Sequence, residues 1–310
     1  APAGRTVRVC DPALGDGELL LALLNSLAER GIVDVYAFGF DTNPAAVKVA
    51  RERISAQHPA VRLELICGSF LDTEAVRHDR SALQGLFEEA PAEYDLLIAN
   101  PPYVRTQVMG SAQAQDLARQ FGLTGRVDLY HAFLCGIGRV LRPGGVAGVI
   151  VSNRFMTTKG GASIRADILE QFHPLHIWDL GDTKLFTAAV LPAVLLLRAK
   201  TGVVEPTSCG FSTIYTTKDA GQAARCRNAI DAIGCSGLVD VEGGERFRVE
   251  HGTLHTGSSP ADVWRLKTGH SDEWLQTVRR HTWSSFGSIG SVRVGVKTTS
   301  DKVFLKTMDT

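Results

Sequence analysis

Short strand-like segments alternate with helix-like segments from Val7 to about Lys200, and this alternation constrains the fold more than any other feature of the sequence. The strand candidates are rich in β-branched residues, whereas the helix candidates repeat apolar residues every three or four positions. Such alternation predicts an α/β fold with a seven-stranded, mostly parallel sheet and helices on both faces. The expected strands are residues 7–10, 35–40, 63–66, 95–99, 146–152, 176–180 and 193–198.

The main helices expected between these strands are residues 17–30, 44–53, 128–141 and 163–172. Pro44 suits the first turn of a helix, and Gly31 suits a position just past the end of one. In open parallel sheets, ligands bind beyond the carboxyl ends of the strands. The residues that follow each expected strand are therefore the first place to look for chemistry.

The sequence changes character after Lys200. Residues 201–290 include a stretch rich in Gly, Ser and Thr without a long periodic pattern, so we expect an irregular insertion or connecting region there. The whole chain has 33 basic and 33 acidic residues, and this balance gives no overall electrostatic attraction to nucleic acid. Residues 276–306 are the exception, with six Lys or Arg residues against one acid.

The sequence favours neither a membrane protein nor a secreted one. The longest apolar run, residues 188–197, is about half of a membrane span and contains Pro192. The six cysteines form no C-x-x-C pair, so we expect reduced thiols and a cytoplasmic location. A zinc site made of Cys209, Cys226, Cys235 and His251 would have irregular spacing, and we therefore expect no metal.

A glycine-containing loop follows the first expected strand and opens the first expected helix. Its glycines allow a sharp turn and close approach of a ligand, although Leu20 replaces the third glycine of a dinucleotide-binding G-x-G-x-x-G pattern. The carboxylate of Asp41, which ends the second strand, is well placed to accept both hydroxyls of a ribose. Ordinary turn chemistry is the alternative. The candidate ligand-binding residues are Asp11, Ala13, Gly15, Gly17, Asp41 and Thr42.

The tetrapeptide Asn100-Pro101-Pro102-Tyr103 follows the fourth expected strand and is the strongest functional signal in the sequence. Two successive prolines fix two φ angles and remove two N–H donors, so the backbone is stiff and offers carbonyl acceptors. The Asn100 side-chain oxygen and the Pro101 carbonyl can accept both N–H bonds of a planar amino group, and Tyr103 adds an aromatic face. This orientation can direct the amino lone pair at a methyl donor without a strong general base. The alternative is a rigid turn that ends the strand.

The glycine loop resembles the methionine-binding loop of methyltransferases that depend on S-adenosylmethionine (SAM). With the tetrapeptide, the chain is similar to the gamma-class (TaqI-like) N6-adenine DNA methyltransferases of restriction–modification systems, over about residues 6–200. The resemblance implies a Rossmann-like SAM-dependent methyltransferase fold, with Asp11 near the sulfonium of SAM and Asn100 in contact with both SAM and the target base. Residues 1–200 would be the catalytic domain, and residues 291–310 the start of a target-recognition region.

Three further positions carry the resemblance. Ser69 and Phe70 match the strand end that flanks the adenine of SAM, where the family usually has an acid in place of Ser69. A hydroxyl can still bond to an adenine edge. Phe186 resembles a second aromatic wall for the target base, with ordinary core packing as the alternative. His131 is expected to be structural.

The resemblance also implies double-stranded DNA as the partner, with the target adenine flipped out of the duplex. Stacking on Tyr103 and Phe186 can stabilise a flipped base by about 1–3 kcal/mol per contact. The polar stretch 104–127 is either a loop that closes over DNA or a solvated helix without contacts. Relatives usually have more chain at both ends, so we expect a fragment, or sites that missing terminal segments or a partner subunit complete.

Two other functions stay open. The same tetrapeptide serves enzymes that methylate protein glutamine or RNA, although the glutamine enzymes usually carry a helical domain before the core, whereas here the extra chain follows it. A chain with this fold can also be a catalytically silent DNA-binding subunit. The intact Asn100 and Tyr103 favour an enzyme.

Overall fold

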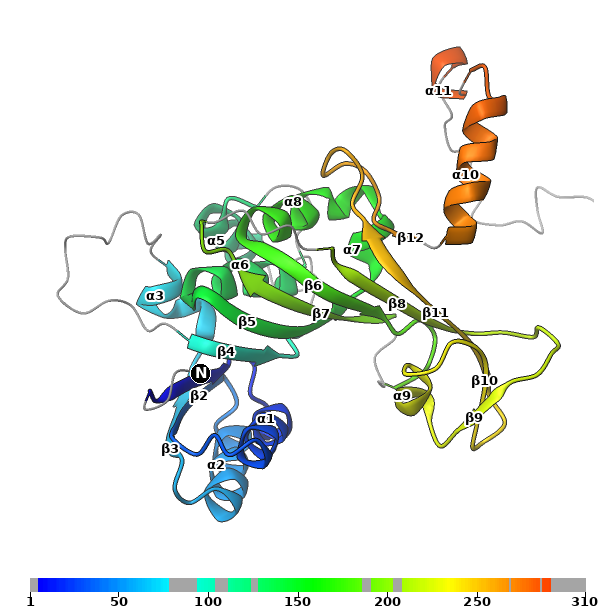
Figure 1. Ribbon diagram of the computed structural model, residues 1–310. Helices are drawn as coiled ribbons and strands as arrows, with labels where there is room; N and C mark the ends of the chain where they lie inside the picture. The colour runs from blue at the N-terminus through cyan, green and yellow to red at the C-terminus, as the bar shows by residue number, and fades with distance from the viewer. Residues whose placement is uncertain are drawn as a thin grey trace, which may run out of the picture. The chain divides into compact units, whose positions relative to one another are not determined.

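The computed structural model describes residues 5–77, 94–103, 111–123, 128–185, 191–202, 208–267, 269–284 and 286–290. The chain divides into two compact units, Ala1–Lys267 and Thr268–Thr310, and not at residue 200. One twelve-stranded sheet forms the framework of the first unit (Figure 1). The described part of the second unit contains the helices α10 (Gly269–His281) and α11 (Phe286–Ile289).

All seven strands expected from the sequence form, in the spatial order β3-β2-β1-β4-β5-β7-β6. Neighbours from β3 to β5 are parallel, and β7 is antiparallel to both β5 and β6. The predicted mostly parallel α/β sheet is therefore confirmed. The strands are β1 (Val7–Asp11), β2 (Val35–Asp41), β3 (Arg62–Cys67), β4 (Tyr94–Ala99), β5 (Leu141–Ser152), β6 (Phe172–Asp179) and β7 (Pro192–Ala199).

Helices cover both faces of this part of the sheet. Successive strand residues point to opposite faces, and apolar side chains on both faces are buried under helices. Val9 packs in one core cluster with Leu20 and Ile54, from α1 and α2, whereas Cys10 packs in another with Ile137, from α6. The helical elements of this unit are α1 (Glu18–Glu29), α2 (Pro44–Gln57), η1 (Phe70–Asp72), α3 (Glu74–Arg77), α5 (Ser111–Phe121), α6 (Leu129–Val140), α7 (Arg154–Thr157), η2 (Lys159–Gly161), α8 (Ala162–Gln171) and α9 (Ala229–Ala232).

The sheet continues beyond β6, whereas an irregular region was expected for residues 201–290. β8 pairs in parallel with β6 and antiparallel with β11, which also pairs with β10 and β12, and β9 lies beside β10. In β11, buried and exposed residues mix, so no continuous apolar run marks it in the sequence. The added strands are β8 (Gly210–Thr216), β9 (Ala224–Cys226), β10 (Gly237–Val241), β11 (Arg246–His255) and β12 (Arg265–Lys267).

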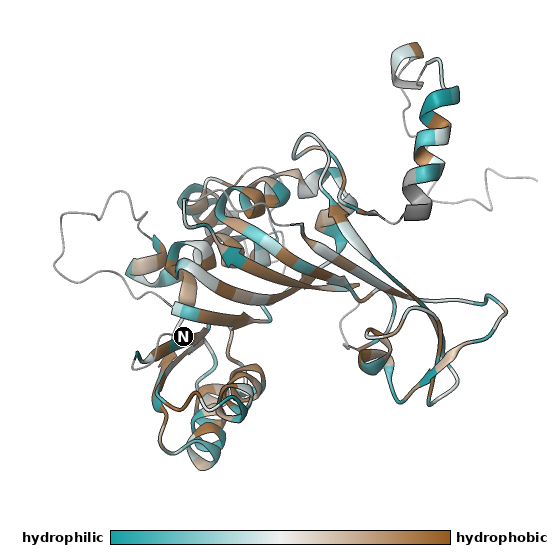
Figure 2. Ribbon diagram, viewed as in Figure 1, coloured by the Kyte–Doolittle hydropathy of each residue, from teal (hydrophilic) through white to brown (hydrophobic). Residues whose placement is uncertain are grey.

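The added strands have a core of their own. Ile214, Val239 and Phe247 pack there with the two buried alanines of α9. Figure 2 shows hydrophobic residues recurring along β5, β6 and β7 in the middle of the sheet. No helix in the described ranges combines the length and the apolar character needed to cross a membrane.

Candidate active site

The glycine loop after β1 is held in place by two carboxylates. The N–H of Ala13 donates to Asp11 Oδ1 at 3.0 Å, and the N–H of Gly15 donates to Asp41 Oδ2 at 2.8 Å. Gly17 has a φ of 83°, which residues with a side chain rarely adopt, and a Cβ there would lie 2.9 Å from the Cβ of Ala50. The loop therefore depends on glycine for its backbone shape and for its close approach to α2.

Asp41 supports the loop and also lines the cavity next to it. Its Oδ1 accepts the N–H of Asn43 at 2.8 Å, so both carboxylate oxygens bind backbone N–H groups. Each oxygen still has lone-pair capacity for a ribose hydroxyl. Asn43 in turn caps α2 by accepting the N–H of Ala45 at 3.0 Å. The ribose contact expected for Asp41 stays a prediction.

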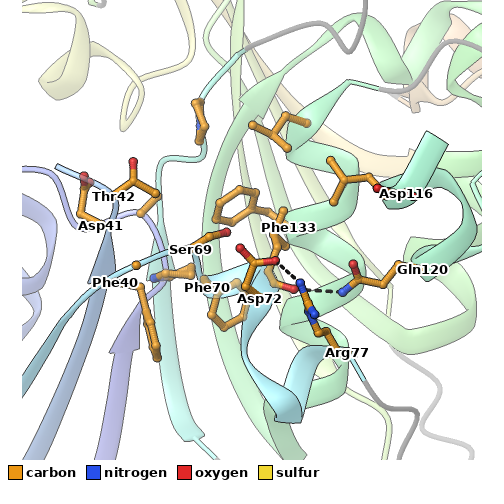
Figure 3. Close-up of a pocket in the computed structure, with 17 residues that line it drawn as sticks. Phe40, Asp41, Thr42, Ser69, Phe70, Asp72, Arg77, Asp116, Gln120 and Phe133 are labelled. Carbon is orange, nitrogen blue, oxygen red and sulfur yellow. Dashed lines mark hydrogen bonds and ion pairs between the residues drawn. The ribbon is translucent and has the colours of Figure 1, made fainter. Parts of the chain in front are cut away.

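A cavity of about 460 Å³ lies beside the glycine loop, at the carboxyl ends of neighbouring parallel strands (Figure 3). Loops that follow β1, β2, β3 and β4 all contribute to its wall, as expected for an open parallel sheet. Five residues predicted from the sequence to bind the cofactor line it: Ala13, Asp41, Thr42, Ser69 and Phe70. From the tetrapeptide, Pro102 lines the cavity. Among the described residues, four other predicted cofactor-binding residues do not line it: Asp11, Gly15, Gly17 and Asn100.

Aromatic rings form one side of the cavity. The ring of Phe70 lies edge-on to Phe40, with centroids 5.6 Å apart, and is stacked on Phe133 at 5.9 Å. Phe70 is buried because it fills the space between β2 and α6. This apolar surface suits the flat ring of a nucleoside base.

The wall opposite Asp41 contains residues that the sequence analysis missed. Asp72 Oδ1 and Arg77 Nη2 form an ion pair at 2.6 Å beside the cavity, and Asp116 also lines it (Figure 3). Asp72 stands three residues after Ser69, so the missing family acid could have been taken as a signal to look for another carboxylate nearby. The sequence signal for Arg77 and Asp116 was weaker, because both resemble ordinary surface charges.

Helix α5 forms the described part of residues 104–127, for which a loop closing over DNA and a solvated helix were the alternatives. It packs on the core through Leu117 and Phe121, and the Gln120 side chain donates to the Leu71 carbonyl at 2.9 Å. The helix is therefore not solvated without contacts, and its position is beside the cavity. Residues 104–110 and 124–127 lie outside the described residues.

The tetrapeptide presents buried polar atoms without partners. Within the described chain, neither the Asn100 side-chain oxygen nor the Tyr103 hydroxyl has a hydrogen-bond partner. Burial raises the pKa of Tyr103 to about 12, so this hydroxyl is neutral at physiological pH. An unpartnered buried polar group costs about 1–3 kcal/mol. Such a cost is typical of a site where a ligand supplies the missing partner.

Asp11 also has a buried side-chain oxygen without a hydrogen-bond partner, its Oδ2. Burial raises the pKa of this carboxyl to about 7; the hydrogen bond from Ala13 opposes the rise, and the charge of Asp41 adds to it. A bound cation would favour the ionised form. The free oxygen of Asp11, the aromatic side of the cavity and Asp41 together fit the amino-acid, adenine and ribose portions of SAM.

Several expected residues play structural roles or lie outside the described residues. His131 Nε2 lies 2.5 Å from Asp167 Oδ2, and Cys135 Sγ lies 3.8 Å from the same oxygen, so these side chains join α6 to α8. The three could offer ligand atoms to a metal ion, but they already bond to one another. Phe186 and residues 291–310 lie outside the described ranges, and their roles stay predictions.

Two of the three cysteines weighed as zinc ligands lie side by side. Cys226 Sγ and Cys235 Sγ are 3.4 Å apart, and His251 bonds to the Cys235 carbonyl through its ring. Cys209 instead packs in the main core cluster. The expected absence of a metal stays a prediction.

Comparison with known proteins gives matches to several methyltransferases. Residues 36–186 match the Eco57I restriction-modification methylase family. Over 97% of its length, the chain is 36% identical to the type II methyltransferase M.BanIII of Aneurinibacillus aneurinilyticus, of which it covers 53%. Over 98% of its length, it is 30% identical to the type II methyltransferase M.XhoI of Xanthomonas vasicola, of which it covers 56%. The chain thus spans about half the length of these relatives.

A shorter match and a solved structure complete the comparison. A release factor glutamine methyltransferase of Moorella thermoacetica is 31% identical, but over only 44% of this chain and 43% of its own. A Listeria monocytogenes protein assigned to the class I SAM-dependent methyltransferases superposes with a TM-score of 0.50 at 22% identity, covering 68% of this chain and 59% of its own. This likeness shows the class I methyltransferase fold.

Proposed function

Because the chain carries a restriction-modification methylase region on the class I methyltransferase fold, whose cofactor is SAM, we propose that it methylates the N6 amino group of adenine in double-stranded DNA. The target base is flipped out of the duplex to reach the site. The observation that carries this proposal is the buried, unpartnered side-chain oxygen of Asn100 beside the cavity wall. An acceptor in that state suits a substrate that brings an N–H donor.

The tetrapeptide orients the amino group. Asn100 Oδ1 accepts one N–H and the Pro101 carbonyl accepts the other, so the nitrogen lone pair is directed away from both oxygens. Tyr103, neutral at physiological pH, supplies an aromatic face for the flipped base. Transfer would form the new N–C bond as the C–S bond of SAM breaks, with S-adenosylhomocysteine as the leaving group. The amino nitrogen would release one proton, so that it ends neutral.

The cofactor residues hold the other reactant. SAM, when bound, supplies a methyl group on a positively charged sulfur. The ionised Asp11 side chain pairs with a cationic portion of the ligand, Asp41 accepts ribose hydroxyls, and Phe70 contacts the adenine. Gly15 and Gly17 keep the loop close to the ligand. These residues bring donor and acceptor together, and no general base is required before transfer.

Duplex DNA is favoured over the alternative substrates by the extent of the similarity. The type II methyltransferases match along nearly the whole chain, including the strands β8–β12. The glutamine methyltransferase matches over less than half of it. The similarity to type II methyltransferases therefore extends beyond the proposed catalytic domain, and this extent supports DNA as the substrate.

The proposal is tested by methyl transfer from radiolabelled SAM to duplex DNA, to RNA and to a protein extract. We expect label in duplex DNA, and its loss when Asn100 is replaced by alanine. Label confined to glutamine residues of protein, or to RNA, would replace DNA by that substrate. Normal SAM binding without label in any substrate would indicate a catalytically silent subunit.

A further inference from the structure

Strand β5 ends beside the tetrapeptide and continues into α7 and η2, residues 154–161, here called the β5 shelf. β4 and β5 are parallel neighbours, with Ala99 opposite Val149. Both strands therefore run toward the same edge of the sheet, where Asn100 follows β4. The shelf lies next to the site that receives the target base in the proposed function.

A buried cation locks the shelf in place. The guanidinium of Arg165, in α8, is fully buried and donates to two carbonyls of the shelf, those of Phe155 and Thr158. It also donates to the carbonyls of Pro260 and Ala261, at 3.0 and 3.1 Å. One side chain thus joins the shelf to the segment that precedes β12.

Two further contacts leave the shelf little freedom to move. A Cβ at Gly161 would lie 2.1 Å from the Phe155 carbonyl oxygen, so the chain can fold this tightly only with glycine there. The N–H of Trp264 donates to the Met156 carbonyl at 2.9 Å, and its ring packs edge-on against Phe155 at 5.5 Å. The backbone of the shelf is therefore preorganised.

The shelf carries two exposed cations, Arg154 and Lys159. Across the described ranges, neither side chain forms an ion pair or a hydrogen bond. Arg154 stands two residues after the end of β5, at the edge of the sheet where the tetrapeptide follows β4.

We propose that Arg154 and Lys159 bind the phosphate backbone of the DNA substrate and position the duplex against the tetrapeptide. This inference rests on the proposed function. Phosphates flank every target nucleotide, and a rigid segment can offer them cations with little loss of conformational entropy on binding. The neutral charge of the whole chain is compatible with such a site, because phosphate binding depends on local cations.

The test is the salt dependence of duplex binding by the 310-residue chain, measured by fluorescence anisotropy with S-adenosylhomocysteine present. Each lost phosphate contact should reduce the slope of log K against log salt by about 0.9 and weaken binding about tenfold at 0.1 M salt. We expect this for Arg154→Ala and for Lys159→Ala. Arg154→Lys keeps the charge and should keep the slope.

Lys200→Ala is the matched control, because this exposed lysine follows β7, which runs antiparallel to β5, and therefore lies at the opposite edge of the sheet. It should leave both slope and affinity unchanged. Binding of S-adenosylhomocysteine should be the same in all variants and so reports folding. Normal methyl transfer to DNA with unchanged slopes in both shelf variants would contradict the role of the shelf alone. Absence of both transfer to DNA and duplex binding in the unmodified chain would contradict the proposed function as well.

Discussion

The two ends of the twelve-stranded sheet are built on different principles. At one end, β3, β2, β1 and β4 are parallel and lie under helices on both faces, and the loops after them line the cavity. At the other end, β8, β11 and β10 are antiparallel neighbours. The partly buried ion pair Arg246–Asp240 joins β11 to β10, and Arg248 of β11 pairs with Asp219, which follows β8. At the parallel end, the loops after the strands are available to bind a ligand. At the other end, the polar side chains mainly bond to one another.

Buried polar atoms show the same contrast. Asp11, Asn100 and Tyr103 each have one without a partner at the parallel end. Throughout residues 210–255, which are all described, every buried side-chain polar atom has a partner; Ser212, for example, bonds to His176 at 2.9 Å and to His251 at 2.8 Å. We infer that ligands bind at the parallel end. The added strands hold the β5 shelf, which lies next to that end, in place.

The largest expected effect concerns the parallel end. Asn100→Ala removes the acceptor that orients the amino group, and we expect methyl transfer to fall by about 100- to 1,000-fold. SAM affinity, measured by calorimetry, should change little. A collapse of SAM affinity instead would assign Asn100 to the cofactor site alone.

The next prediction tests whether the added strands fix the shelf. Arg165→Met leaves four backbone carbonyls without their donor, and we expect the free energy of unfolding to fall by about 4 kcal/mol. Urea denaturation measures it. Arg225→Met, at an exposed position of β9, should change it by less than about 0.5 kcal/mol. If both changes lowered the free energy of unfolding equally, the proposed role of Arg165 in joining the shelf to the residues before β12 would be contradicted.

Gly17 and Gly237 have the same φ of 83°, one at each end of the sheet. Comparing alanine substitutions at the two positions distinguishes the cost of backbone strain from the cost of close packing. An added Cβ meets nothing within 4 Å at Gly237, but lies 2.9 Å from Ala50 Cβ at Gly17. We expect Gly237→Ala to cost about 1 kcal/mol of stability and Gly17→Ala about 3 kcal/mol. If thermal unfolding gave the same loss for both, the glycine loop would not be tightly packed on α2.

The smallest expected effect is a pH dependence at the cofactor site. The pKa of Asp11 is raised to about 7, so its carboxyl is mostly neutral at pH 6 and becomes ionised as the pH rises. If the ionised form binds SAM, affinity at pH 6 should be about tenfold below its plateau. Asp11→Asn should weaken binding and abolish this dependence in calorimetry. A pH profile that Asp11→Asn leaves intact would assign the titration to another group.

The sequence made one end of the sheet much easier to predict than the other. β7 and the part of β5 from Val146 onward are largely apolar, so residues 193–198 and 146–152 could be predicted as strands. The first five residues of β5, which include Arg142, were missed. β8 pairs with β6 and β11 pairs with β8, and local patterns do not encode such long-range pairing.

The same distinction applies to the site. The glycine loop and the tetrapeptide are contiguous in sequence and were recognisable. Asp72, Arg77 and Arg154 resemble ordinary surface charges until the fold brings them to the edge of the cavity or of the shelf. Ala13, Asp41, Thr42, Ser69 and Phe70 line one cavity, and their predicted contact with the cofactor stays a prediction.

We propose that Asn100 directs a methyl group to an exocyclic adenine nitrogen in duplex DNA. Mass spectrometry can identify the nucleosides of duplex DNA that the chain has treated with SAM carrying a deuterated methyl group. We expect deuterated N6-methyldeoxyadenosine, and its loss in Asn100→Ala. Label in a methylated cytosine instead, or the same adenine product from Asn100→Ala, would contradict it.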